Sequence, residues 1–207
     1  MKTLTKEMQD AITSSMALQL LKDGNKRFVN NLKINRNLLQ QANETSDGQH
    51  PFAVILSCID SRTSAELVFD QGLGDVFSIR IAGNIVNEDI LGSMEFGCKV
   101  AGAKIIVVLG HTKCGAVKGA CDNVALGNLT GLISKIKPAV EQESVTSENR
   151  NSSNGVFVEN VAELNVSLSV KNILLKSPII ADMVKNGDIG IVGGIHDITT
   201  GEVKFFE

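Results

Sequence analysis

The chain has 207 residues, of which 43% are hydrophobic, and a formal net charge of −3. This length and apolar content suit one globular domain with a sizeable core and exclude a wholly disordered chain. The sequence has neither a basic stripe, nor an apolar run of the roughly 18 residues that a membrane helix needs, nor the apolar core of a signal peptide, so we expect a cytoplasmic protein with no nucleic-acid or membrane partner.

Residues 1–45 predict an N-terminal helical arm. Ser14 and Ser15 can cap its main helix, whose apolar positions recur at helical spacing. A polar break at residues 43–48 separates this arm from the remaining chain, 46–207, which we interpret as a single α/β domain. The periodicity leaves open whether the arm covers the sheet of its own chain or packs on a second subunit.

The rest of the chain alternates strand and helix patterns, which is typical of an α/β fold with a mainly parallel sheet. Strands are predicted at 52–56, 76–80, 104–109, 189–195 and 202–206, and helices at 63–69, 90–100, 115–122, 129–140, 156–175 and 177–186. The polar stretch 141–154 is either a solvated linker or a long helix end. Within the longest helix, Asn165 and Ser167 are expected to face solvent. We therefore expect a central sheet of four to five strands flanked by helices.

Two of the predicted strands lead into residues that bind metals. Cys58 follows the apolar run 52–56, and His111 follows the run 105–109, with Cys114 three residues later. Zinc prefers sulfur and nitrogen ligands, and catalytic zinc sites typically use three protein ligands and keep the fourth tetrahedral position open. Because ligands bind at the carboxyl ends of strands in open α/β sheets, we expect these three side chains to hold one Zn²⁺.

The remaining two cysteines and the pair His196-Asp197 are predicted to have structural roles. The chain has four cysteines and no Cys-x-x-Cys pair, so metal binding is a better interpretation than disulfides. Cys98 and Cys121 lie in apolar or small-residue stretches and are predicted to be packed core thiols. His196 and Asp197 precede a hairpin-like turn, and we assign them a structural role.

Asp60 and Arg62 lie directly beside the first predicted ligand. Three arrangements are open. The carboxylate can pair with the guanidinium beside the metal, it can turn to the zinc as an alternative fourth ligand, or the two can form an ordinary surface ion pair. A zinc ion with four filled positions would indicate a non-catalytic structural site.

The pattern Cys-x-Asp-Ser-Arg at 58–62, followed by His-x-x-Cys-Gly at 111–115, resembles the β-class carbonic anhydrases, and Arg-x-Ala-Gly-Asn at 80–84 is similar to a third stretch of that family. The resemblance covers roughly residues 17–206. It implies reversible hydration of CO2 to bicarbonate and a proton by attack of a zinc-bound hydroxide, with one Zn²⁺ per chain in a homodimer or homotetramer. Since two thiolates add negative charge at the metal, we expect activity to favour alkaline pH. Hydrolysis of CS2 or COS on the same fold is the close alternative.

The resemblance also implies roles for individual residues. Arg62 holds Asp60 away from the metal, and Asp60 then accepts a hydrogen bond that orients the attacking group. The implied substrate-binding residues are Gln49, which reaches into the neighbouring subunit's site, and Phe77, Ala82, Phe96 and Gly115. Some members carry a regulatory bicarbonate pocket built from Trp, Gly and Val. This chain has Ile55, Ser57 and Thr63 at those positions, so we expect no bicarbonate site of that type.

Overall fold

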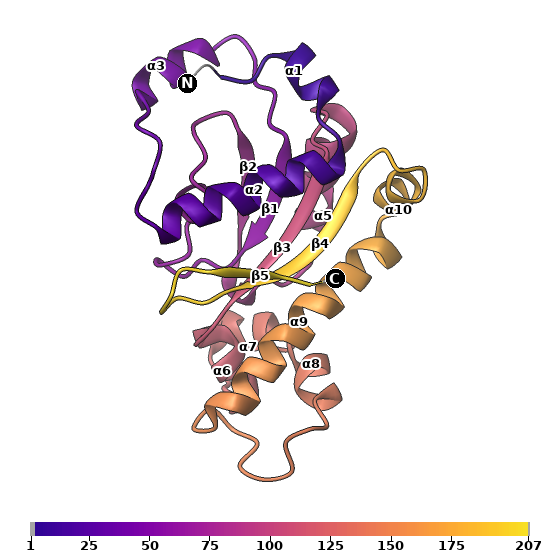
Figure 1. The fold of residues 1–207 in the computed structure, drawn as a ribbon. Coiled ribbons are helices and arrows are strands. Elements are labelled where there is room, and N and C mark those ends of the chain that lie inside the picture. Colours follow the sequence, from indigo (N-terminus) through magenta and orange to yellow (C-terminus); the bar gives the residue numbers. More distant parts are fainter. Residues whose placement is uncertain (1–2, 207) are drawn as a thin grey trace.

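Within residues 3–206, which the computed structural model describes, the strands are β1 Ala53–Ser57, β2 Val76–Arg80, β3 Ile105–His111, β4 Gly190–His196 and β5 Val203–Phe205. They form one sheet in the order β2-β1-β3-β4-β5 (Figure 1). The first four strands are parallel, and β5 runs antiparallel to β4. This confirms the predicted α/β fold with a mainly parallel central sheet. Residues 1, 2 and 207, at the ends of the predicted arm and domain, lie outside the described part.

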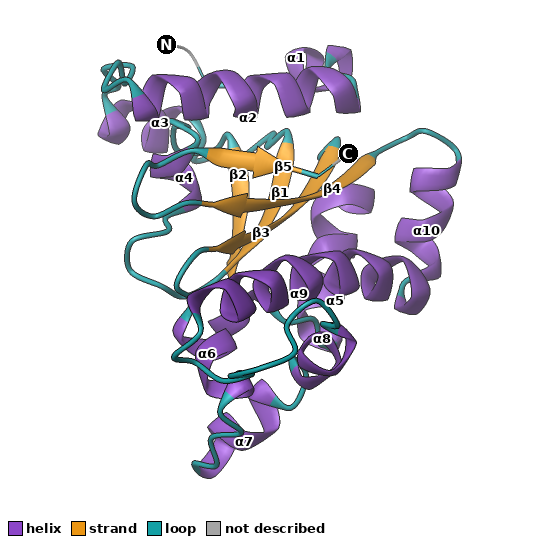
Figure 2. Ribbon diagram, turned by 60° about the horizontal axis from the view of Figure 1, so that its bottom comes forward, coloured by secondary structure: helices purple, strands orange, loops and turns teal. Residues whose placement is uncertain are grey.

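Helices cover both faces of the sheet (Figure 2). One side carries α1 Lys6–Ala11, α2 Ser14–Val29, α3 Leu38–Glu44 and α4 Ala65–Val68. The other side carries α5 Glu88–Glu95, α6 Gly115–Cys121, α7 Gly127–Ile133, α8 Lys137–Gln142, α9 Gly155–Lys176 and α10 Pro178–Lys185. Among the described residues, no helix is both long enough and apolar enough to cross a membrane.

The two central strands are buried along their whole length because both of their faces meet helices. Alternate side chains of β1 and β3 enter two different cores. Val54, Leu56, Ile106 and Val108 pack in the core under α9, while Ala53, Ile55, Ile105 and Val107 pack in the core under α2. The continuous apolar runs of the sequence are therefore explained by burial on two sides.

The predicted arm packs on the sheet of its own chain. Ala17 and Leu21 of α2 are fully buried in the core that β1 and β3 share with it. The capping residue of α2 is Thr13, one residue before the predicted Ser14 and Ser15. The Thr13 side chain accepts the Met16 N–H. A contact of this arm with a second subunit stays a prediction.

Two predicted features differ in the structure. The single helix predicted at 129–140 is two helices, α7 and α8, and Pro138 lies in the first turn of the second, a position that suits its fixed φ and missing N–H. The prediction that Asn165 faces solvent is wrong: its side chain is buried and donates to the Gly83 carbonyl. The stretch after α8 is a loop, in which the buried Glu143 accepts from Thr146.

A buried ion cluster fastens the arm to the sheet domain. Asp70, whose side chain is 3% exposed, pairs with Arg27 at 2.5 Å and with Arg36 at 2.6 Å. The same carboxylate also accepts the Ile34 N–H at 3.3 Å. Because Arg27 and Arg36 lie before and after the end of α2, one carboxylate fixes the path of the chain between α2 and α3.

We expect Asp70→Asn to lower the free energy of unfolding by about 3 kcal/mol, because the substitution leaves two guanidinium groups without their buried counter-charge. Urea unfolding followed by circular dichroism measures this change. The matched control is Asp10→Asn, which removes an exposed pair with Lys6 and should leave the urea midpoint unchanged. Equal midpoints for Asp70→Asn and the parent chain would contradict a fastening role.

Candidate metal centre

Cys58, His111 and Cys114 form one buried cluster at the carboxyl edge of the sheet, and their ligand atoms all lie within 4.8 Å of one another. Cys58 follows β1, His111 ends β3, and Cys114 immediately precedes α6. The two Sγ atoms are 3.9 Å apart. For tetrahedral zinc with Zn–S bonds of about 2.3 Å, the expected separation of two sulfur ligands is about 3.8 Å. The thiol spacing therefore fits a shared zinc ion.

The imidazole of His111 is prepared to act as a ligand. Its Nδ1 lies 2.9 Å from the Thr112 carbonyl oxygen. Because a carbonyl oxygen only accepts, Nδ1 carries the proton and Nε2 presents its lone pair. That Nε2 atom is buried and has no hydrogen-bond partner in the described part of the chain. An unpartnered buried nitrogen costs free energy, and a metal ion would satisfy it.

The two thiols of the cluster differ in their acidity. The hydrogen bond between them lowers the pKa of Cys58 and raises the pKa of Cys114 above its ordinary value, so Cys58 is the thiol that ionises first. The Gly83 N–H also donates to Cys58 Sγ at 3.3 Å. Metal binding would then displace the remaining proton.

The other two cysteines have a different environment. Burial raises the pKa of Cys98 to about 12 and that of Cys121 to about 11. Both side chains lie in the large core under α9. This confirms the prediction that they are packed core thiols.

Asp60 is held by Arg62 rather than turned into the cluster. Arg62 donates from Nε to Oδ1 at 2.9 Å and from Nη2 to Oδ2 at 2.8 Å, and its backbone N–H donates to Oδ1 at 3.0 Å. The guanidinium holds the pKa of the Asp60 carboxyl well below its usual range. Oδ2 lies 4.0 Å from His111 Nε2, so the carboxylate is next to the position that a metal would take without filling it.

Arg80, to which the sequence reasoning assigned no role, holds the loop that carries Cys58 and Asp60. Its Nε donates to the Cys58 carbonyl at 3.1 Å and its Nη2 to the Asp60 carbonyl at 2.6 Å. Arg80 ends β2 opposite Ser57 of β1. A charged residue at the end of a strand beside the first motif is the signal that points to this role.

His196 links the two halves of the motif. Its ring Nδ1 lies 3.3 Å from Thr63 Oγ1, and its carbonyl accepts the Thr112 N–H at 3.0 Å. Burial lowers the pKa of His196 to about 4, so the ring is neutral at neutral pH. These contacts agree with the structural role assigned to it from the sequence.

The predicted substrate-binding residues do not all meet in one chain. Ala82 precedes Gly83, and Gly115 follows Cys114, so both are next to the cluster. Phe77 and Phe96 contact each other edge to face, with ring centroids 6.1 Å apart, and line a groove of about 680 Å³ along the edge strand β2. Gln49 is exposed and precedes β1, whereas the cluster follows it.

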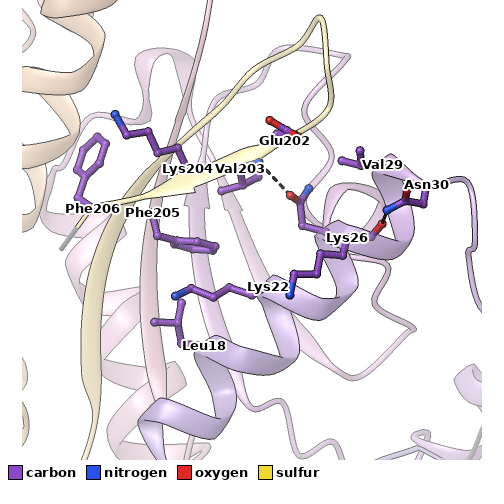
Figure 3. A pocket seen from close by; sticks show the side chains of 11 residues that line it. Leu18, Lys22, Lys26, Val29, Asn30, Glu202, Val203, Lys204, Phe205 and Phe206 are labelled. Atoms are coloured by element: carbon purple, nitrogen blue, oxygen red, sulfur yellow. Dashed lines mark hydrogen bonds between the residues drawn. The ribbon is translucent and has the colours of Figure 1, made fainter.

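A second groove, of about 550 Å³, lies between α2 and β5 (Figure 3). Its walls include Lys22, whose Nζ is 5.8 Å from the Phe205 ring centroid, and Asn25, whose Oδ1 accepts the Val203 N–H at 2.9 Å. Neither the cysteines nor the histidine of the cluster line it. This groove is therefore separate from the candidate metal centre.

Comparison with known proteins agrees with this geometry. The carbonic anhydrase family model matches residues 53–203. Carbonic anhydrase 2 of Mycobacterium tuberculosis is 34% identical over 197 residues, which cover 89% of each chain. The β-carbonic anhydrase CafA of Aspergillus fumigatus has 27% identity and a TM-score of 0.70, covering 93% of this chain and 90% of its own. A tetrameric β-carbonic anhydrase of Sordaria macrospora has 26% identity and a TM-score of 0.70, with 79% and 84% covered. The chain therefore belongs to the β-class carbonic anhydrase family and is an enzyme.

Proposed function

We propose that the chain catalyses the reversible hydration of CO2 to bicarbonate and a proton, with one Zn²⁺ held by Cys58, His111 and Cys114. The observation that carries this proposal is the unpartnered, buried Nε2 of His111, which faces two thiols 3.9 Å apart. The nearest further ligand, Asp60, is already bound by Arg62. Three ligands with a fourth position left open is the arrangement of a catalytic zinc site and not of a structural one.

A bound zinc ion supplies a Lewis acid that lowers the pKa of a coordinated water towards neutrality. The protein's own contribution is to hold the Asp60 carboxylate ionised beside the open metal position. With the metal bound, the Asp60 carboxylate would accept a hydrogen bond from the attacking water and so orient it towards the carbon of CO2. Arg62 keeps the carboxylate in this position. We assign the Gly115 N–H the role of holding a substrate oxygen.

We further propose that the substrate pocket is completed by a second copy of the chain. Gln49, Phe77 and Phe96 lie away from the cluster of their own chain, with Phe96 half exposed at the β2 edge. Two copies that meet along this edge would each lend these residues to the other's metal centre. The tetrameric relative from Sordaria macrospora supports a homodimer or homotetramer.

The first test is stopped-flow CO2 hydration by the zinc-loaded chain from neutral to clearly alkaline pH. We expect activity that rises with pH, because two thiolate ligands acidify a coordinated water less than neutral imidazoles do. Cys114→Ala should lose both the metal and the activity, while the matched core variant Cys98→Ala keeps one zinc per chain. A zinc-loaded chain without CO2 hydration at any pH would overturn the proposal, and turnover of CS2 or COS would identify the alternative substrate.

Arg62→Ala should lower kcat/KM for CO2 by about 100-fold or more while one zinc per chain remains bound. The reason is that Asp60, without its guanidinium partner, is free to turn to the metal and fill the open position. Metal analysis and stopped-flow kinetics on the same sample separate the two effects. Lys99→Ala, an exposed cation elsewhere, is the control. Full activity in Arg62→Ala, or loss of its zinc, would contradict the assigned role.

Gln49→Ala should lower CO2 hydration by about 10-fold through loss of one hydrogen bond to substrate, with zinc content unchanged. The decisive measurement mixes this variant with Arg62→Ala under conditions that exchange subunits. A mixed dimer has one site with an intact Arg62 and a Gln49 from the partner, so activity should exceed the sum of the two separate samples. A fully active, monodisperse monomer would refute a shared site.

A further inference from the structure

Two polar side chains interrupt the buried face of α9. Asn165 is 3% exposed and Ser169, one turn later, is 4% exposed, among neighbours that include Val161, Val166 and Ile173. Residues four apart lie on the same face of a helix, so both point the same way. A buried amide in apolar surroundings is tolerated only where its hydrogen bonds are made. The partners of these two side chains therefore indicate why they are present.

Both side chains bond the same short turn, Ala82–Asn84. Asn165 Nδ2 donates to the Gly83 carbonyl at 2.9 Å, and Ser169 Oγ donates to the Asn84 carbonyl at 3.3 Å. The turn contains two consecutive left-handed residues, since φ is +68° at Gly83 and +42° at Asn84. Such conformations are uncommon and persist where surrounding contacts hold them.

The same turn supplies a hydrogen bond to a predicted metal ligand. The Gly83 N–H donates to Cys58 Sγ at 3.3 Å. Gly83 is also closely packed: a Cβ at this position would lie 2.6 Å from Ile136 Cδ1 and 3.2 Å from Ala116 Cβ. The turn therefore lies between α9, whose side chains donate to its carbonyl oxygens, and the cluster, whose Cys58 Sγ accepts from its Gly83 N–H.

We propose that Asn165 is a positioning residue for the metal centre, acting through Gly83. By fixing the Gly83 carbonyl, Asn165 keeps the preceding amide aimed at Cys58 and so moderates the charge that this thiolate presents to the metal. Residues that orient a metal ligand without touching the metal typically contribute 10–100-fold to metal affinity. The inference rests on the proposed metal site but not on its turnover of CO2.

The test compares Asn165→Leu, which keeps the size of the side chain but removes the donor, with Ser167→Ala on the same helix. Within residues 3–206, the Ser167 hydroxyl bonds only to the Glu163 carbonyl of its own helix, so its loss should change nothing at the centre. Zinc affinity is measured by competition with a chelator, and Co²⁺ replaces zinc as a visible probe. Thermal unfolding of the metal-free chains reports on stability separately.

We expect Asn165→Leu to weaken zinc binding by about 10–100-fold. We also expect its thiolate-to-Co²⁺ charge-transfer band to move to longer wavelength, because a sulfur that loses a hydrogen bond gives up electron density more easily. Ser167→Ala should match the parent chain in both. A folded Asn165→Leu with parental affinity and an unshifted band overturns the proposal, even if its melting temperature falls, because helix packing alone would then explain the residue.

Three further outcomes are decided by the same measurements. If Asn165→Leu does not fold, Asn165→Ser, whose hydroxyl is too short to reach the Gly83 carbonyl, is judged by the same band and affinity. If the parent chain binds Co²⁺ but hydrates no CO2, the proposed function falls while the role of Asn165 is still measured. If the parent chain binds no metal at all, both proposals are refuted.

Discussion

The parallel pairing of β1 with β3 is the constraint on which the metal centre depends. Ser57 lies opposite Leu109 in this register. Cys58, one residue after Ser57, and His111, two residues after Leu109, therefore lie at the same edge of the sheet although they are 53 positions apart in the chain. Burial on both faces fixes this register, because a slip of one residue would exchange the side chains that enter the two cores. The helices on either side therefore stabilise the ligand geometry as well as the fold.

The thiols of the cluster and the carboxylate of Asp60 are held by different kinds of partner. The thiols are buried and receive fixed backbone donors, whereas Asp60 is held by an Arg62 side chain that is 54% exposed. Exposed ion pairs are worth little and weaken with salt. The pair between Asp60 and Arg62 is therefore partly open to solvent, unlike the buried thiols.

The sequence allowed the sheet and the metal cluster to be predicted because both leave strong local signals. Each strand is a continuous apolar run, and thiols and an imidazole follow the two strands that pair. What it missed depends on tertiary context. Helical periodicity does not show that Asn165 lies on the buried face. The partner of its amide, the Gly83 carbonyl, belongs to a turn that is far away in the sequence. The role of Arg80 likewise depends on tertiary structure, because its bonds to the Cys58 and Asp60 carbonyls require that β2 lies beside β1. Pro138 is a local signal for the start of α8, because proline suits the first turn of a helix and not its interior.

The placement of Gln49 separates the requirements for metal binding from those for substrate binding. Gln49 precedes β1, whereas the cluster lies at the carboxyl end of this strand. The five residues of β1 alone span about 16 Å, so the Gln49 side chain cannot reach the cluster of its own chain. The three predicted metal ligands, by contrast, come from one chain, and their ligand atoms already lie within 4.8 Å of one another. A single chain therefore contains all three predicted metal ligands, while any role of Gln49 at substrate requires a second copy. Assembly would then control catalysis without controlling the metal content.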